Sequence, residues 1–236
     1  MDMHEGEAHS RDEVNVNGQT YDLGDPVVLG REILTLSGHV PATEHQLILI
    51  HHSRSCLIGS DDKVDLHKER GAVFRAFRSD RTWAFTLNEG GQVWGAEALD
   101  VGELRRLWGV PGDLELVLER DDDADVVLTE GGTVNLGGAG VEDIVTRLPK
   151  PGFVLVSVHS TAGVYPAEGS IRVKASTTIA DVIERARAAL EIVPGTDWII
   201  QVGTRDIDPS LTFAGAMLAG TVELSWGPRE GGGGAR

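Results

Sequence analysis

The chain has 236 residues, 41% of them hydrophobic, which is enough for one to three domains with apolar cores. Its 21 Lys and Arg against 37 Asp and Glu give a formal charge of -16, which argues against nucleic acid or an anionic membrane as partner and favours a basic protein surface. The single cysteine, Cys56, excludes an internal disulfide and a cysteine-based zinc site.

The acidic, polar start of the chain lacks the basic and apolar regions of a signal peptide. No apolar run approaches the roughly 18 residues that a membrane span needs. We therefore expect a cytoplasmic protein with a disordered leader over residues 1–12.

The first predicted elements are a hairpin, a short helix and two strands. Asn17-Gly18 lies between alternating residues and is typical of a tight hairpin turn, because such a turn needs positive φ. The elements predicted after it are a helix over 30–39 and strands over 46–52 and 71–77.

The same order of elements recurs twice further along the chain. The second set has a hairpin over 83–95 with Gly90-Gly91 at its turn, a helix over 100–110, and strands over 114–120 and 140–148. The third set has a hairpin over 153–176, a helix over 177–190, and strands over 198–204 and 220–226.

The third helix has the clearest sequence pattern. Thr178 is placed to cap it, and an apolar stripe with i, i+3, i+4 spacing follows, formed by Ile179, Val182, Ile183, Ala186 and Leu190. A mixed sheet with one helix packed across it buries both apolar faces, so the predicted fold class is α+β.

The third unit resembles ubiquitin. Its "TTIADVIERARAAL" is similar to that family's helix start, and "WIIQVGTRDIDPSLTFAGAMLAGTVELSW" is similar to its third strand, glycine turn and last strand. The first unit, with "VNGQTY", "EILTLSG", "QLILI" and "VDLHKERGAVF", resembles the bacterial multiubiquitin domain, and the second is a weaker copy. The resemblance implies three tandem ubiquitin-like β-grasp domains, at 13–80, 81–149 and 152–228, and a flexible glycine tail at 229–236.

The resemblance also implies a function for the tail "REGGGGAR". Ubiquitin-like modifiers are adenylated at a C-terminal glycine, passed to a cysteine as a thioester and then attacked by an amine or hydroxyl. Ala235 and Arg236 would block this chemistry, so the chain resembles a precursor that a peptidase trims within the run Gly231, Gly232, Gly233 and Gly234. The spacing from the last strand favours Gly232 as the acyl donor, and the smallest cut favours Gly234.

Partner contacts are implied at two places. Arg229 stands where family members carry an arginine read by the activating enzyme, although Glu230 departs from the family's more basic stretch. Alignment through Gly203 puts Ile200, with Trp198 beside it, at the family's apolar contact patch. Strand alternation places Trp198, Ile200 and Val202 on one face and Ile199 with Gln201 on the other, so a buried strand is the alternative for Ile200.

The implied partners are an activating enzyme that uses ATP, a conjugating enzyme, a processing or deconjugating peptidase, and a target protein. The chain itself is expected to need no cofactor and not to be an enzyme. The resemblance implies a bacterial pathway with isopeptide or ester bonds and a role in antiphage defence. A non-covalent interaction scaffold is the alternative function, and a sulfur carrier is a further one.

Other motifs favour structural roles. His51 and His52 are adjacent at a strand end, so they are expected on opposite faces and not as a metal pair. "RDDDAD" (120–125) lacks the glycine and glutamate of a calcium loop, and the glycine-rich 128–140 lacks a phosphate-loop lysine. Cys56 has no evident general base in the sequence.

Overall fold

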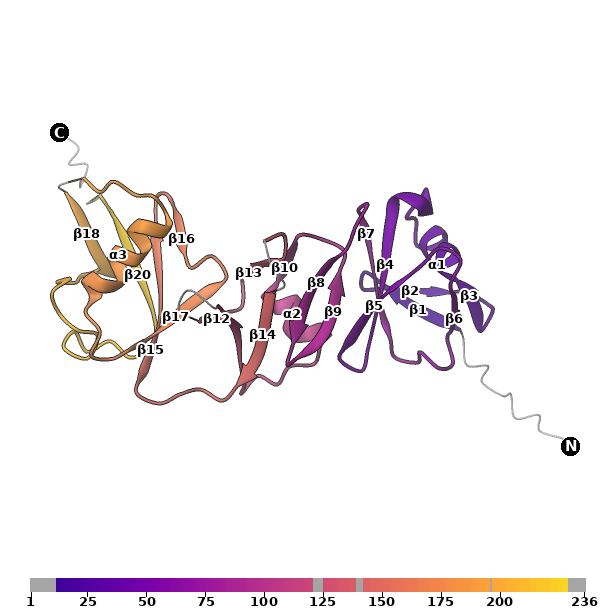
Figure 1. The fold of residues 1–236 in the computed structure, drawn as a ribbon, viewed down its shortest axis with the longest axis horizontal. Coiled ribbons are helices and arrows are strands. Elements are labelled where there is room, and N and C mark those ends of the chain that lie inside the picture. The colour runs from indigo at the N-terminus through magenta and orange to yellow at the C-terminus, as the bar shows by residue number, and fades with distance from the viewer. Residues whose placement is uncertain (1–11, 121–124, 139–141, 196, 229–236) are drawn as a thin grey trace, which may run out of the picture. The chain divides into compact units, whose positions relative to one another are not determined.

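The computed structural model describes residues 12–120, 125–138, 142–195 and 197–228 (Figure 1). The chain divides into two compact units. The first holds Met1–Phe85, Gly90–Glu97 and Leu107–Gly109, and the second holds Thr86–Glu89, Ala98–Arg106 and Val110–Arg236.

The N-terminal segment, residues 13–78, forms a five-stranded mixed sheet covered by one helix. Its sheet has the order β2-β1-β7-β4-β5, with β1 parallel to β7 and every other pair antiparallel. The strands are β1 (Glu13–Val16), β2 (Gln19–Asp22), β4 (His45–His51), β5 (Arg54–Ile58) and β7 (Val73–Arg78). A separate small sheet pairs β3 (Val27–Leu29) with β6 (Lys63–Asp65), and a 3-10 turn spans Ala42–Glu44.

The helix of this segment is α1 (Gly30–Leu36), whose Ile33 and Leu34 are buried. They form one core with the inward side chains of the sheet, among them Val14, Val16, Leu47, Leu49 and Phe74. Because side chains alternate along a strand, this core uses every second residue of β4.

The middle segment, residues 83–147, repeats this plan. It contains β8 (Trp83–Leu87), β9 (Gly90–Trp94), β10 (Ala98–Asp100), α2 (Val101–Leu107), β11 (Glu115–Glu119), β12 (Val126–Leu128), β13 (Thr133–Asn135) and β14 (Glu142–Arg147). The sheet order β8-β14-β11-β12 matches β1-β7-β4-β5 position by position. Strands β10 and β13 form a separate pair, as β3 and β6 do.

The C-terminal segment, residues 153–228, has the order β17-β15-β20-β18-β19, with β15 parallel to β20. Its elements are β15 (Phe153–Ser160), β16 (Gly163–Tyr165), β17 (Gly169–Lys174), α3 (Ile179–Ala189), β18 (Trp198–Val202), β19 (Arg205–Asp206) and β20 (Gly220–Pro228). Thr178 Oγ1 accepts from the Asp181 amide at 3.2 Å, which confirms the predicted cap, and the stripe Ile179, Val182, Ile183 and Ala186 is buried.

The sheets of the middle and C-terminal segments are one continuous sheet. Strand β12 pairs antiparallel with β17, so that Val126 lies opposite Ile171 and Leu128 opposite Gly169. The two backbones approach each other closely at this pairing. A Cβ on Gly132 would overlap Glu168 O, and a Cβ on Gly169 would overlap Val127 O. Two ion pairs span this junction. In one, the arginine comes from the C-terminal segment, Arg172 with Glu115; in the other, it comes from the middle segment, Arg120 with Glu168 at 2.9 Å.

The first unit buries both faces of the N-terminal sheet. On β4 the face away from α1 carries Ile48 and Ile50, which are 0% and 3% exposed. On β7 the same face carries Phe77, whose ring lies 4.7 Å from that of Trp94 with an edge-on geometry. Residues 90–97 therefore cover a sheet face that α1 does not.

Hydrogen bonds of Gln92 hold residues 90–97 against this sheet face. Its side chain is 4% exposed, and its Oε1 accepts from the Ser55 amide at 2.8 Å and from Trp108 Nε1 at 2.9 Å. Ser55 Oγ in turn accepts from the Val93 amide at 2.8 Å. A buried amide with its partners satisfied orients the contact without an unpaired polar atom.

Two hairpin turns share one asparagine geometry. Asn17 and Asn88 both have positive φ, and their amides donate to Phe74 O and Ile144 O of the last strand at 3.0 and 2.9 Å. Each side-chain oxygen accepts from the amide two residues further along the same strand. Asn17 accepts from Ala76 at 3.1 Å, and Asn88 accepts from Thr146 at 2.8 Å. The prediction of an Asn17-Gly18 turn is confirmed.

The prediction for the second turn was wrong. The turn lies at Asn88 and Glu89, with φ of 50° and 66°, and Gly90 already begins β9. The side chain of Asn88 stabilises that conformation through its bonds to Thr146, so no glycine is required. The sequence also left β5, β12 and the small sheet pairs undetected, since these strands have only three to five residues.

Candidate functional site

The site residues predicted in the tail lie outside the described residues: Arg229, Gly231, Gly232, Gly233, Gly234 and Ala235. The described chain leads up to them through β20, which lies between β15 and β18 in the sheet and ends at Pro228. Among the described residues, no helix is both long and apolar enough to cross a bilayer.

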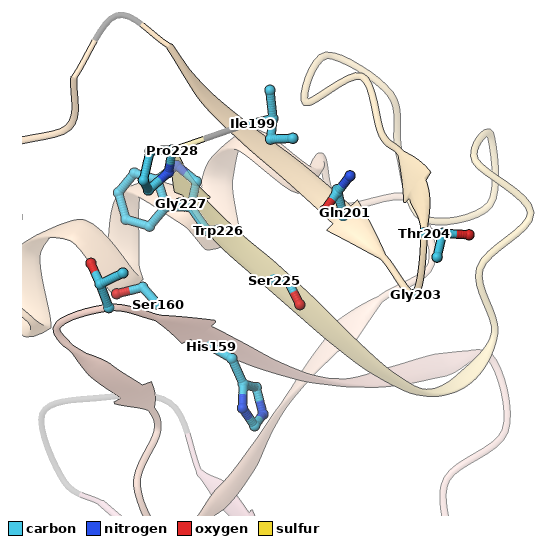
Figure 2. Close-up of a pocket in the computed structure, with 11 residues that line it drawn as sticks. His159, Ser160, Ile199, Gln201, Gly203, Thr204, Ser225, Trp226, Gly227 and Pro228 are labelled. Atoms are coloured by element: carbon cyan, nitrogen blue, oxygen red, sulfur yellow. The ribbon is translucent and has the colours of Figure 1, made fainter. Parts of the chain in front are cut away.

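The C-terminal sheet has an open face on the side away from α3 (Figure 2). A broad depression of about 940 Å³ lies there, lined by His159, Ser160, Thr161, Ile199, Gln201, Gly203, Thr204, Ser225, Trp226, Gly227 and Pro228. We call this depression the open face.

The open face follows from strand register. Ile199 lies opposite Gly227 and Gln201 opposite Ser225 across β18 and β20, and Figure 2 shows Ile199 and Gln201 on one side of β18. His159 continues the row on β15, opposite Ser225. Short side chains on the central strand leave the depression shallow, and a Cβ at Gly227 would meet no atom within 4 Å.

The open face combines apolar side chains with several hydrogen-bonding groups. Ile199, Trp226 and Pro228 supply the apolar surface, while Gln201 and Ser225 supply donors and acceptors. His159 Nε2 lies 3.2 Å from Ser157 Oγ, two residues away on the same face of β15, and this contact orients the ring. Such a surface can bind an extended or folded protein segment, but it presents no assembled set of nucleophile, base and oxyanion donors.

Ile200 does not lie on the open face. It is 7% exposed and belongs to the core beneath α3, which corrects the expectation that Ile200 is a surface contact. The alternation of β18 is the physical reason: residues of one parity face the helix, and Ile199 and Gln201 have the other parity. The sequence contained this signal, because the same alternation was predicted for β18.

Trp198 also has the helix-side parity. Its ring lies 4.9 Å from that of Trp226 in an edge-on arrangement, and it packs partly buried against the core. Its remaining surface lines a second depression, on the side of α3, that sequence reasoning did not detect.

His51 and His52 do not point to opposite faces. Their rings stack at 3.8 Å, because β4 ends at His51 and His52 adopts a φ of 49°, where strand alternation no longer applies. His51 Nδ1 lies 2.8 Å from Glu69 Oε2. Within the described ranges, no group of three or more potential metal-binding side chains occurs.

Cys56 lies exposed on β5. The pKa of its thiol is raised, mainly because neighbouring atoms partly exclude water from the sulfur and secondly because of the Glu69 carboxylate. The raised pKa lowers the fraction of thiolate, the form that acts as a nucleophile. The acidic run at 120–125 falls mostly on 121–124, outside the described residues.

A family model described as Multiubiquitin matches residues 13–78. Among solved structures, a designed protein based on ubiquitin is 22% identical over 36% of this chain and 100% of its own, with a TM-score of 0.28. No curated protein matches the chain.

The strand order and the family match support a ubiquitin-like fold for the N-terminal segment. In particular, this segment matches a multiubiquitin domain. Domains of this class are generally non-enzymatic, and the absence of enzyme activity in this chain stays a prediction.

Proposed function

We propose that the chain is a ubiquitin-like protein modifier made of three tandem β-grasp domains, at 13–80, 81–149 and 152–228. The recurring strand order supports the three domains, as does the shared geometry of Asn17 and Asn88. The observation that carries the function is the glycine run at 231–234, which begins three residues after the end of β20, the central strand of the C-terminal sheet.

The proposed chemistry takes place on the backbone of the tail at 229–236. A peptidase removes Ala235 and Arg236, and the exposed glycine carboxylate attacks the α-phosphate of ATP on the activating enzyme, releasing pyrophosphate. A cysteine thiolate then displaces AMP, and an amine or hydroxyl of the target displaces the thiolate. Glycine favours these steps because it has no Cβ to crowd the acyl carbon.

The conjugation test uses two shortened chains, one ending at Gly232 and one ending at Gly234. Each is incubated with ATP and the proteins encoded by neighbouring genes, and intact mass is followed. A covalent, ATP-dependent adduct on one or both chains supports the proposal, and the more active chain identifies the acyl donor. The absence of any adduct, with full-length chain also unprocessed, contradicts it.

The open face is proposed as the contact for the conjugation partners, with Ile199 and Gln201 taking the place that sequence alignment gave to Ile200. Arg229 is retained as a proposed contact of the activating enzyme. An Ile199→Arg substitution is expected to slow adduct formation while leaving the fold intact, because its side chain is partly exposed. Equal adduct rates for the substituted and original chains would remove the open face from this role.

The resemblance supports a cytoplasmic bacterial pathway with a role in defence against phage. Deleting the gene is expected to raise the efficiency of phage plating, and a copy lacking residues 231–236 should fail to restore defence. Restoration by that shortened copy would favour the second candidate function, a non-covalent scaffold. The continuous sheet of the middle and C-terminal segments favours that candidate, because it holds two folded segments in a fixed register.

A further inference from the structure

A second depression lies on the helix side of the C-terminal segment, between α3 and the strands β18 and β19. It has a volume of about 610 Å³, within the range of protein binding sites. Its lining is Ala180, Ile183, Glu184, Pro194, Gly195, Trp198, Ile199, Ile200, Asp206, Ile207, Asp208, Pro209 and Trp226. We call it the helix-side groove.

The floor of the helix-side groove is apolar and fixed. Ile183, Ile207 and Trp226 are buried members of the segment's core, so they cannot move away without disturbing it. Trp198 forms one wall, held edge-on against Trp226. A rigid apolar floor with an aromatic wall fits an aliphatic or aromatic side chain of a partner.

The groove is open because β19 is short. Only Arg205 and Asp206 pair with β18, opposite Val202 and Gln201, and the chain then turns across the end of the sheet. The Ile207 amide donates to Ile200 O at 2.8 Å, which fixes the turn that carries Asp206 and Asp208 to the groove's edge. The neighbouring Val193 is 91% exposed and extends the apolar surface beside Pro194.

The edge of the groove is acidic. Among the described residues, its lining includes Glu184, Asp206 and Asp208 and no lysine or arginine. Hydrogen bonds from the Ser210 side chain, and then from its amide, lower the pKa of Asp208 and keep that carboxylate charged. Glu184 is paired with Arg187 at 2.8 Å, Asp206 accepts from Gln201 Nε2 at 2.8 Å and Asp208 accepts from Ser210, so neighbouring side chains hold all three carboxylates at the edge of the groove.

We propose that the helix-side groove binds a basic segment of a partner protein, which inserts one aliphatic or aromatic side chain between α3 and β18 and places lysine or arginine beside Asp206 and Asp208. This site lies on the other face of β18 from Gln201 and Ser225 of the open face. The two depressions share Ile199 and Trp226 in their linings and differ in the remaining residues. The inference does not depend on conjugation.

The test follows amide and indole signals of the full chain by NMR during titration with a short synthetic peptide. The peptide has a central leucine flanked by arginine and lysine. Shift changes are expected at Ala180, Ile183, Trp198 and Ile207, and binding should weaken as salt is added, since the charges are exposed. Replacing the leucine by serine, or the basic residues by glutamate, should abolish the changes.

The matched variants remove two charges each. Asp206→Asn with Asp208→Asn keeps the side-chain oxygens that accept from Gln201 and Ser210, and should weaken peptide binding about tenfold. Glu191→Gln with Glu223→Gln removes two exposed charges outside the groove and should change binding less than about twofold. The spectra themselves verify that each variant is folded.

Three outcomes overturn the proposal. One is the absence of shift changes at millimolar peptide. Another is a set of changes confined to His159, Gln201 and Ser225, which would assign the peptide to the open face. The last is equal binding by both double variants, which would show that the acidic edge plays no part.

Discussion

The N-terminal and C-terminal segments share one strand order but use the sheet face opposite the helix differently. In the N-terminal segment that face is buried, and Ile48 and Ile50 of β4 are its most deeply covered residues. In the C-terminal segment the same face is open and carries Gln201 and Ser225. One fold can therefore use the same sheet face for internal packing in one copy and leave it uncovered in another.

The largest expected difference in stability comes from truncating one isoleucine on each of these two sheet faces. Ile48→Ala should cost about 2–5 kcal/mol of unfolding free energy, because it leaves a cavity in a closed site. Ile199→Ala should cost less than about 1 kcal/mol, because its side chain is already partly exposed. Hydrogen exchange of amides in β4 and β18 measures both, and equal losses would mean that the two faces do not differ.

A second substitution tests the continuous sheet. Gly132→Ala should cost about 1–3 kcal/mol, because its Cβ would overlap Glu168 O. The control Gly227→Ala adds a Cβ in open space and should be nearly neutral. Faster amide exchange in β12 and β17 of the first variant alone is the expected result; unchanged exchange there would contradict the close approach.

A third pair of substitutions tests what the first two segments share. Asn17→Gly and Asn88→Gly keep the positive φ but remove the bonds to Ala76 and Thr146, at a cost of about 1–2 kcal/mol each. Thermal unfolding gives the loss. The C-terminal hairpin turns through Thr161-Ala162 instead, so a cost at only one asparagine would weaken the case for a shared device.

The smallest expected effect concerns pH. Burial, and then the neighbouring His45, lower the pKa of His39 below 6.5. The unfolded chain therefore takes up this proton first, so stability is complete above about 6.5 and falls as the pH drops through that value toward the folded pKa. His39→Gln should flatten the pH dependence of Tm between about pH 7 and 5; an unchanged slope would assign the dependence to other groups.

Local sequence predicted much of the fold. The Thr178 cap and the α3 stripe followed from periodicity, and the Asn17-Gly18 turn followed from the need for positive φ. The turn at Asn88-Glu89 escaped detection because its conformation depends on hydrogen bonds to Thr146, a distant strand. Short strands such as β5 escaped because their pairing, and not their own pattern, defines them.

Some features of the candidate site could likewise be predicted from local sequence, and others could not. Alternation along β18 already separated Ile199 and Gln201 from Ile200, since side-chain direction in a strand is a local property. The order of the glycines after β20 is likewise read from the sequence alone. Which face of a sheet is covered depends on segments far along the chain, such as Gln92 against Ser55 of β5 and Trp94 against Phe77 of β7.

Composition and local spacing were enough to give the order of elements, the single cysteine, the acidic charge and the glycine run. Two features became visible only in the folded chain: the joining of the middle and C-terminal sheets through β12 and β17, and the apolar groove with an acidic edge beside Trp198. Both features depend on backbone approach and strand length, which long-range packing sets.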